Sequence, residues 1–73
     1  MLLQKEMTNI IETIFDYDME DYHKIIRTIS NSSNEKEGLE IADSYCKSNH
    51  VDTFHDDVIE FKSYISDYFS QSQ

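Results

Sequence analysis

The chain has 73 residues, of which 38% are hydrophobic, and its formal net charge at neutral pH is −9. A chain of this length forms one small domain with a limited core, and its apolar content is too high for a fully disordered protein. Because so negative a surface repels nucleic acid and anionic lipid, the composition argues against direct binding to either and favours a basic protein as partner.

The sequence contains no proline and one glycine, so a fold built from many short strands is disfavoured. We therefore predict an all-α protein, a small antiparallel bundle of three to four helices forming a single domain over residues 1–73. No apolar run is long enough to span a membrane, and residues 1–6 lack the pattern of a signal peptide. The single cysteine, Cys46, cannot form an internal disulfide, which favours a cytoplasmic location.

Two helices are predicted in the first thirty residues, over 2–16 and 18–30. At about 100° per residue, one unbroken helix would carry Asp18 and Asp21 onto its apolar side. Asp18 is a good N-cap residue, and Asp21 follows it at the spacing of a capping box, so we predict a break near residues 16–18. The apolar stripe of the first helix consists of Leu3, Met7, Ile10, Ile11, Ile14 and Phe15, and that of the second consists of Met19, Tyr22, Ile25, Ile26 and Ile29.

A polar loop, residues 30–34, separates the second helix from a third, which we predict over 35–48. Glu35 and Glu37 lie in its first turn, where their charges favour the helix dipole. Gly38 is expected to weaken this helix slightly. Its apolar residues are Leu39, Ile41, Ala42, Tyr45 and Cys46.

The most regular apolar stripe belongs to a fourth helix, predicted over residues 53–69 with Thr53 or Asp52 as its N-cap. The stripe consists of Phe54, Val58, Phe61, Ile65 and Tyr68, which recur at alternating steps of four and three residues. A small core combined with so long a stripe also suggests self-association, and a homodimer with this helix as its seam is one expectation.

A row of carboxylates lies opposite this stripe. Asp52, Asp56 and Glu60 recur every four residues, Asp57 lies beside them and Asp67 follows two turns later. On a helix, neighbouring carboxylates of the row lie about 6 Å apart and repel one another by a few tenths of a kcal/mol per pair. The row is either a solvated face or a binding surface for a basic protein, and the second interpretation includes partial imitation of a DNA backbone.

Tyrosine is favoured at protein interfaces, and Tyr17 and Tyr64 lie outside the main stripes. The predicted partner-binding residues are therefore Asp52, Asp56, Asp57, Glu60, Tyr64 and Asp67.

Metal chemistry is a weaker hypothesis. Cys46 and His50 have the spacing of two ligands on one helix, and His55 and Asp56 follow, but one thiolate with scattered histidines is a poor zinc pattern. No nucleophile is paired with a base, and one glycine cannot build a phosphate-binding loop. We predict no catalytic residue, metal or cofactor.

The sequence thus favours a non-enzymatic acidic protein that inhibits or regulates a basic, nucleic-acid-handling protein. Its size and composition are similar to those of small helical immunity proteins that block basic nuclease toxins, although no motif is shared. The alternative is a small helical adaptor or chaperone that binds another protein by apolar helix packing.

Overall fold

A computed structural model describes residues 5–71, with side chains described from Thr8 onwards. It contains four helices, α1 (Lys5–Phe15), α2 (Met19–Ser30), α3 (Glu35–Ser48) and α4 (Asp56–Gln71), and the described residues include no strand. The predicted all-α bundle is therefore confirmed. The predicted start of the first helix at residue 2, with Leu3, lies outside the described residues, as does the side chain of Met7.

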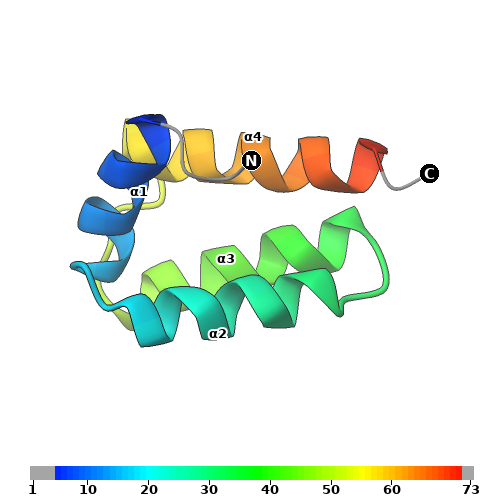
Figure 1. Cartoon of the computed structure of the whole chain (residues 1–73), viewed down its shortest axis with the longest axis horizontal. Helices are drawn as coiled ribbons and strands as arrows, with labels where there is room; N and C mark the ends of the chain where they lie inside the picture. Colours follow the sequence, from blue (N-terminus) through cyan, green and yellow to red (C-terminus); the bar gives the residue numbers. More distant parts are fainter. Residues whose placement is uncertain (1–4, 72–73) are drawn as a thin grey trace.

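The helices pack in a simple order (Figure 1). α2 and α3 form an antiparallel hairpin, α4 runs antiparallel to α3, and the short α1 lies across one end and contacts both α4 and α2. None of the described helices combines the length and the apolar character needed to cross a membrane.

The predicted break between the first two helices is confirmed, and Asp18 caps α2 by accepting a hydrogen bond from the Asp21 backbone N–H at 3.1 Å. In the turn between α1 and α2, the backbones of Asp16 and Tyr17 adopt the left-handed conformation, with φ of 51° and 62°. The Asp21 carboxylate accepts a hydrogen bond from the Tyr45 hydroxyl at 3.1 Å, and so links α2 to α3.

Two side chains accept hydrogen bonds from backbone N–H groups at the start of α3. The Asn34 side chain accepts from the Glu37 backbone N–H at 2.9 Å, and the Glu37 carboxylate accepts from the Ser33 backbone N–H at 2.6 Å. Two of the N–H groups near this helix start are thereby satisfied, which fixes the point where the loop ends.

The predicted start of the fourth helix at residue 53 is wrong, because α4 begins at Asp56. Asp52 caps the preceding turn, accepting from the Phe54 N–H at 2.9 Å, while its carbonyl accepts from the His55 N–H at 3.0 Å. The helix cap is the His55 ring, whose Nδ1 accepts from the Asp57 N–H at 3.0 Å. Residues 51–55 therefore form part of the turn between α3 and α4 and do not belong to the helix.

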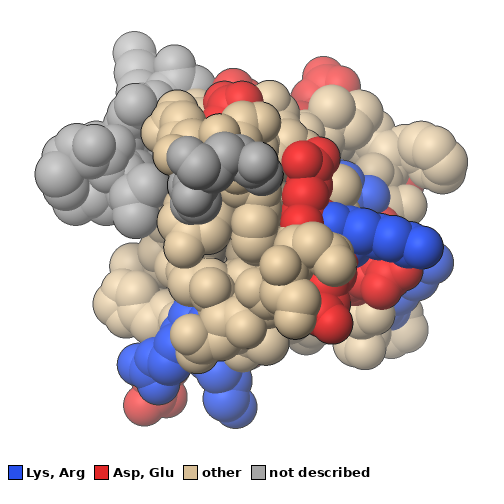
Figure 2. Space-filling model, turned by 90° about the vertical axis from the view of Figure 1, so that its right-hand side faces the viewer, with Lys and Arg blue, Asp and Glu red and all other residues tan. Residues whose placement is uncertain are grey.

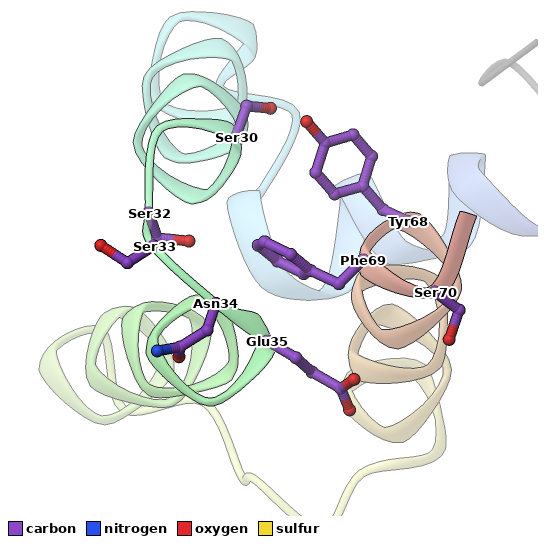
Figure 3. Close-up of a pocket in the computed structure, with 8 residues that line it drawn as sticks. All are labelled: Ser30, Ser32, Ser33, Asn34, Glu35, Tyr68, Phe69 and Ser70. Carbon is purple, nitrogen blue, oxygen red and sulfur yellow. The ribbon is translucent and has the colours of Figure 1, made fainter. Parts of the chain in front are cut away.

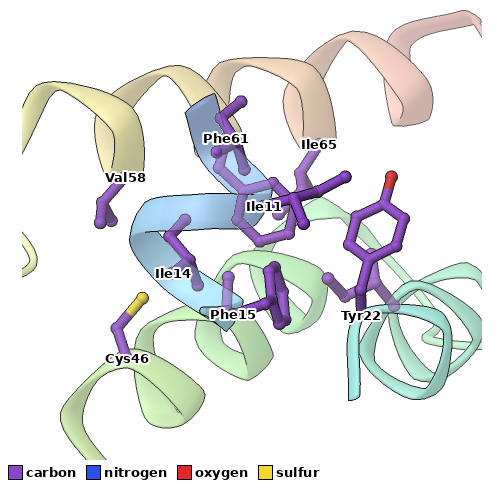
Figure 4. Packing of buried hydrophobic residues seen from close by; sticks show 11 residues of the cluster. Ile11, Ile14, Phe15, Tyr22, Cys46, Val58, Phe61 and Ile65 are labelled. Carbon is purple, nitrogen blue, oxygen red and sulfur yellow. The ribbon is translucent and has the colours of Figure 1, made fainter. Parts of the chain in front are cut away.

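All four helices contribute to one core (Figure 4). The Phe15 ring lies at its centre, with ring centroids 5.3 Å from Tyr22, 4.9 Å from Tyr45 and 5.9 Å from Phe61. These contacts join α1 to each of the other three helices. The remaining buried hydrophobic residues are Ile10, Ile11, Ile14, Ile29, Ala42, Cys46, Val58 and Ile65.

Three predicted core residues are exposed instead: Phe54 (84%), Tyr68 (46%) and Met19 (41%). Phe54 precedes α4, so the helical period that aligns it with Val58 does not apply. Tyr68 belongs to the last turns of α4, far from the end that α1 covers (Figure 1), and Met19 is the first residue of α2.

The other three residues of the predicted α4 stripe belong to the core as expected. Their burial contradicts the prediction that this stripe is the seam of a homodimer. Val58, Phe61 and Ile65 are at most 4% exposed within a single chain. They pack against the other helices of their own chain and cannot form the seam of a dimer.

Gly38 allows the three long helices to approach closely. A Cβ atom at this position would lie 2.8 Å from a ring carbon of Phe69 and 3.3 Å from the Cγ2 atoms of Ile29 and Ile65. The expectation that Gly38 only weakens α3 is therefore incomplete, because the missing side chain leaves room for α2 and α4.

Candidate partner-binding surface

The outer face of α4 carries three of the predicted carboxylates in one line. At about 100° per residue, Asp56, Glu60 and Asp67 fall within about 40° of one another around the helix, opposite the buried stripe. Asp56 and Asp67 are exposed and Glu60 is half-buried. Eleven residues separate the first from the last, so the line is about 16 Å long. We call these three residues the acidic face.

Two predicted members of the row lie elsewhere. Asp52 is exposed but precedes the helix, so the predicted spacing of i, i+4, i+8 is wrong at its first member. Asp57 is half-buried and turned towards α1, where its carboxylate accepts a hydrogen bond from the Thr13 hydroxyl. Its role in the fold is to fasten α4 to α1, and it does not belong to the acidic face.

Tyr64 is not an exposed interface residue as predicted, because it is half-buried and packs against the core. Its position on α4 lies between the acidic face and the buried stripe. Tyr17 is 58% exposed, in agreement with its predicted position outside the stripes.

Lys62, the cation of α4, is already paired. Asp43 of α3 lies 2.6 Å from the Lys62 ammonium and 3.4 Å from that of Lys47. The hydrogen bond from Lys62, together with the positive charges of both lysines, lowers the pKa of the Asp43 carboxyl. Among residues 8–71, no ion pair joins a cation to Asp52 or to any member of the acidic face. The negative charge of this surface is therefore uncompensated within the described structure.

Charges of both signs occur at the end of the molecule that lies away from α1. Figure 2 shows the end formed by the α2–α3 connection and the last turns of α4, where Lys or Arg side chains lie among Asp and Glu side chains. Such a mixed surface is less suited to a basic partner than the start of α4 and the turn before it, where residues 51–60 contain four acids and no Lys or Arg.

The residues considered for metal binding do not gather. Cys46 is fully buried, and burial raises the pKa of its thiol. His50 follows the end of α3, and the His55 ring caps α4. Across the described part of the chain, no group of three His, Cys, Asp or Glu side chains is placed to hold a metal ion.

Two surface grooves are lined by residues outside the acidic face. One, of about 510 Å³, lies where Ser30 and the α2–α3 loop face Tyr68 and Phe69 of α4 (Figure 3). Several of its polar groups already serve the fold: Asn34 caps α3, and the Ser32 hydroxyl donates to the Ile29 carbonyl at 2.6 Å. The other groove, of about 370 Å³, lies between α2 and α3 and is lined by Ile25, Glu37, Glu40, Ile41, Ser44, Tyr45 and Ser48.

Two apolar residues beside the acidic face were missed by the sequence prediction. Phe54 was assigned to the core, and Ile59, which is 54% exposed, was assigned to no stripe. A signal was present for Ile59, because an isoleucine directly after Val58 lies about 100° away from the buried stripe. For Phe54 there was none, because its exposure depends on where α4 begins.

Comparison of the chain with protein-family models, with curated proteins and with solved structures found no match.

Proposed function

We propose that this chain is a non-enzymatic, acidic binding protein of the cytoplasm that inhibits or regulates a basic, nucleic-acid-handling protein. The observation that carries the proposal is the acidic face of α4, whose carboxylates have no cationic partner among residues 8–71. An uncompensated row of charges on a rigid helix attracts an oppositely charged protein over several ångströms and orients it during encounter.

The spacing of the acidic face suggests how it would act on such a partner. Asp56 and Glu60 are one helical turn apart and lie about 6 Å from each other, a separation of the same order as that between successive phosphates of a nucleic-acid strand. A basic surface that binds a nucleic-acid backbone can therefore bind this helix instead. Partial imitation of DNA, as an inhibitor or an immunity protein would use it, is part of the proposal.

The test is capture from a cell lysate with three forms of the immobilised chain. The test variant carries Glu60→Lys and Asp67→Lys, and the matched control carries Glu12→Lys and Glu20→Lys, two exposed residues outside both grooves, which changes the net charge equally on α1 and α2. Lysine at residue 67 lies near the C-terminus of α4, where a cation favours the helix dipole, so we expect the test variant to fold.

We expect the wild type and the control to capture the same basic protein, and the test variant to lose it. Capture should also weaken as the salt concentration rises, because exposed charges are screened. Equal loss in both variants would show that only net charge matters. Equal capture by all three forms would show that the acidic face is merely a solvated surface.

A second candidate function, a small helical adaptor or chaperone, is favoured by the groove between α2 and α3. Its apolar lining comes from Ile25, Ile41 and Tyr45, all half-buried, so an apolar helix of another protein has a place to pack. Salt dependence separates the two functions, because apolar packing does not weaken as salt rises. A captured protein that stays bound at 1 M salt (~3 Å screening length) would favour the adaptor.

A further inference from the structure

Two exposed apolar side chains, Phe54 and Ile59, border the start of α4. They are 84% and 54% exposed, whereas Val58 and Phe61 of the same helix are 0% and 2% exposed. Neither exposed residue belongs to the core, so their apolar character is not explained by the fold. We call Phe54 and Ile59 the apolar anchors.

The backbone that carries Phe54 is held on both sides. Its own N–H donates to the Asp52 carboxylate, and the next N–H, that of His55, donates to the Asp52 carbonyl. The His55 ring in turn caps α4, and the carbonyl of His55 accepts from the Ile59 N–H at 3.0 Å. Both anchors are therefore presented from ordered backbone, which lowers the entropy lost when a partner binds.

Within residues 51–60 every formal charge is negative, and Lys62, three residues after Ile59, is already paired with Asp43. Residues 51–60 contain Asp52, Asp56, Asp57 and Glu60 and no Lys or Arg, and Asp52 and Asp56 are exposed beside the anchors in the chain. A second copy of this chain would bring the same charges and be repelled. The surface is complementary to apolar side chains flanked by Lys or Arg.

We propose that the apolar anchors, together with Asp52 and Asp56, dock a basic amphipathic helix of the partner protein. The apolar side of that helix contacts Phe54 and Ile59, and its Lys or Arg side chains pair with the two carboxylates. Aromatic anchors supply much of the binding energy of an interface, while charges around them govern specificity and the rate of association. This inference rests on the proposed function and names the element of the basic partner that is recognised.

The probe is a synthetic 18-residue peptide of leucine and lysine, with leucine at the i, i+3, i+4, i+7 positions of a helix. A scrambled peptide of equal composition has the same charge but no apolar side. Both are titrated into the isotopically labelled full chain, and binding is followed by the NMR signals of the backbone amides. We expect the amphipathic peptide to bind about tenfold more tightly and to shift mainly the signals of residues 52–60.

The test variant is Phe54→Ala with Ile59→Ala, and the control is Tyr17→Ala with Met19→Ala, which removes two other exposed apolar side chains. Because all four side chains are substantially exposed, we expect both variants to melt close to the wild type. The test variant should lose the tenfold preference for the amphipathic peptide, and the control should keep it.

The outcomes separate this inference from the proposed function. If both peptides bind equally and the test variant is unaffected, the docking inference is overturned while charge-driven binding stands. If the amphipathic peptide shifts signals of the α2–α3 groove instead, the docking inference is likewise overturned. If neither peptide binds, basic chemistry is not recognised, and both the inference and the proposed function are wrong.

Discussion

Gly38→Ala tests the packing of the three long helices most directly, because two opposing effects act at this position. In an exposed helix interior, alanine is more favourable than glycine by about 1 kcal/mol. Here the added Cβ would lie 2.8 Å from a Phe69 ring carbon and 3.3 Å from methyl carbons of Ile29 and Ile65. Overpacking of this kind costs about 1–3 kcal/mol. We therefore expect the free energy of unfolding to fall by about 1 kcal/mol.

Urea denaturation followed by circular dichroism at 222 nm measures this change. A matched control, Ser44→Ala, lies on the exposed side of the same helix and should leave stability unchanged or raise it slightly. Because the closest contact is with the Phe69 ring, Phe69→Ala should cost less in the Gly38→Ala background than in the wild type, with a coupling of about 1 kcal/mol. If Gly38→Ala stabilises the protein as propensity alone predicts, α3 does not approach α2 and α4 as closely as described.

Three further predictions concern the core, the end of α3 and a half-buried tyrosine. Phe61→Ala should lower the free energy of unfolding by about 3–5 kcal/mol in urea denaturation, because Phe61 is 2% exposed and packs on Phe15; a melt like that of the wild type would contradict its burial. His50→Gly should raise the free energy of unfolding by about 0.5–1 kcal/mol, and with it the melting temperature, because His50 has φ of 60°, where glycine is unstrained. An unchanged or lower melting temperature would argue against that backbone conformation. Burial and the hydrogen bond to Asp21 raise the pKa of Tyr45 to about 12. The contribution of the protonated Tyr45 hydroxyl to the free energy of unfolding is therefore fully present below pH 10 and is lost as the pH rises towards 12. In denaturation at pH 8 and pH 11, Tyr45→Phe should lose less stability than the wild type, and an equal loss would show that Tyr45 does not titrate this way.

The sequence was sufficient for the fold class and for the break after α1. Both depend on local chemistry: the near absence of glycine and proline favours helices, and an unbroken helix would have buried Asp18 and Asp21. The central stripe of α4 was equally clear, because Val58, Phe61 and Ile65 recur at helical spacing and are all buried. Two residues of the acidic face, Asp56 and Glu60, were placed together for the same reason.

The tertiary structure decided the details that depend on how the chain turns and on what each side chain meets. The start of α4 was misplaced because Asp52 and His55 both offer caps, and only the complete turn shows that Asp52 holds Phe54 while His55 caps the helix. That shift of three residues exposes Phe54 and removes Asp52 from the helical row. Asp57 was misassigned because its partner, Thr13, is forty-four positions away in the sequence.

Gly38 also shows the difference between what local sequence predicts and what tertiary packing decides. Local propensity describes a glycine in a helix as a weakness, since it considers only the backbone of that helix. Whether the missing side chain also serves a purpose depends on residues of α2 and α4, brought there by packing over long sequence separations. Periodicity and capping chemistry act within a few residues and can be read from the chain, whereas close approach, exposure and long-range pairing exist only once the helices have packed.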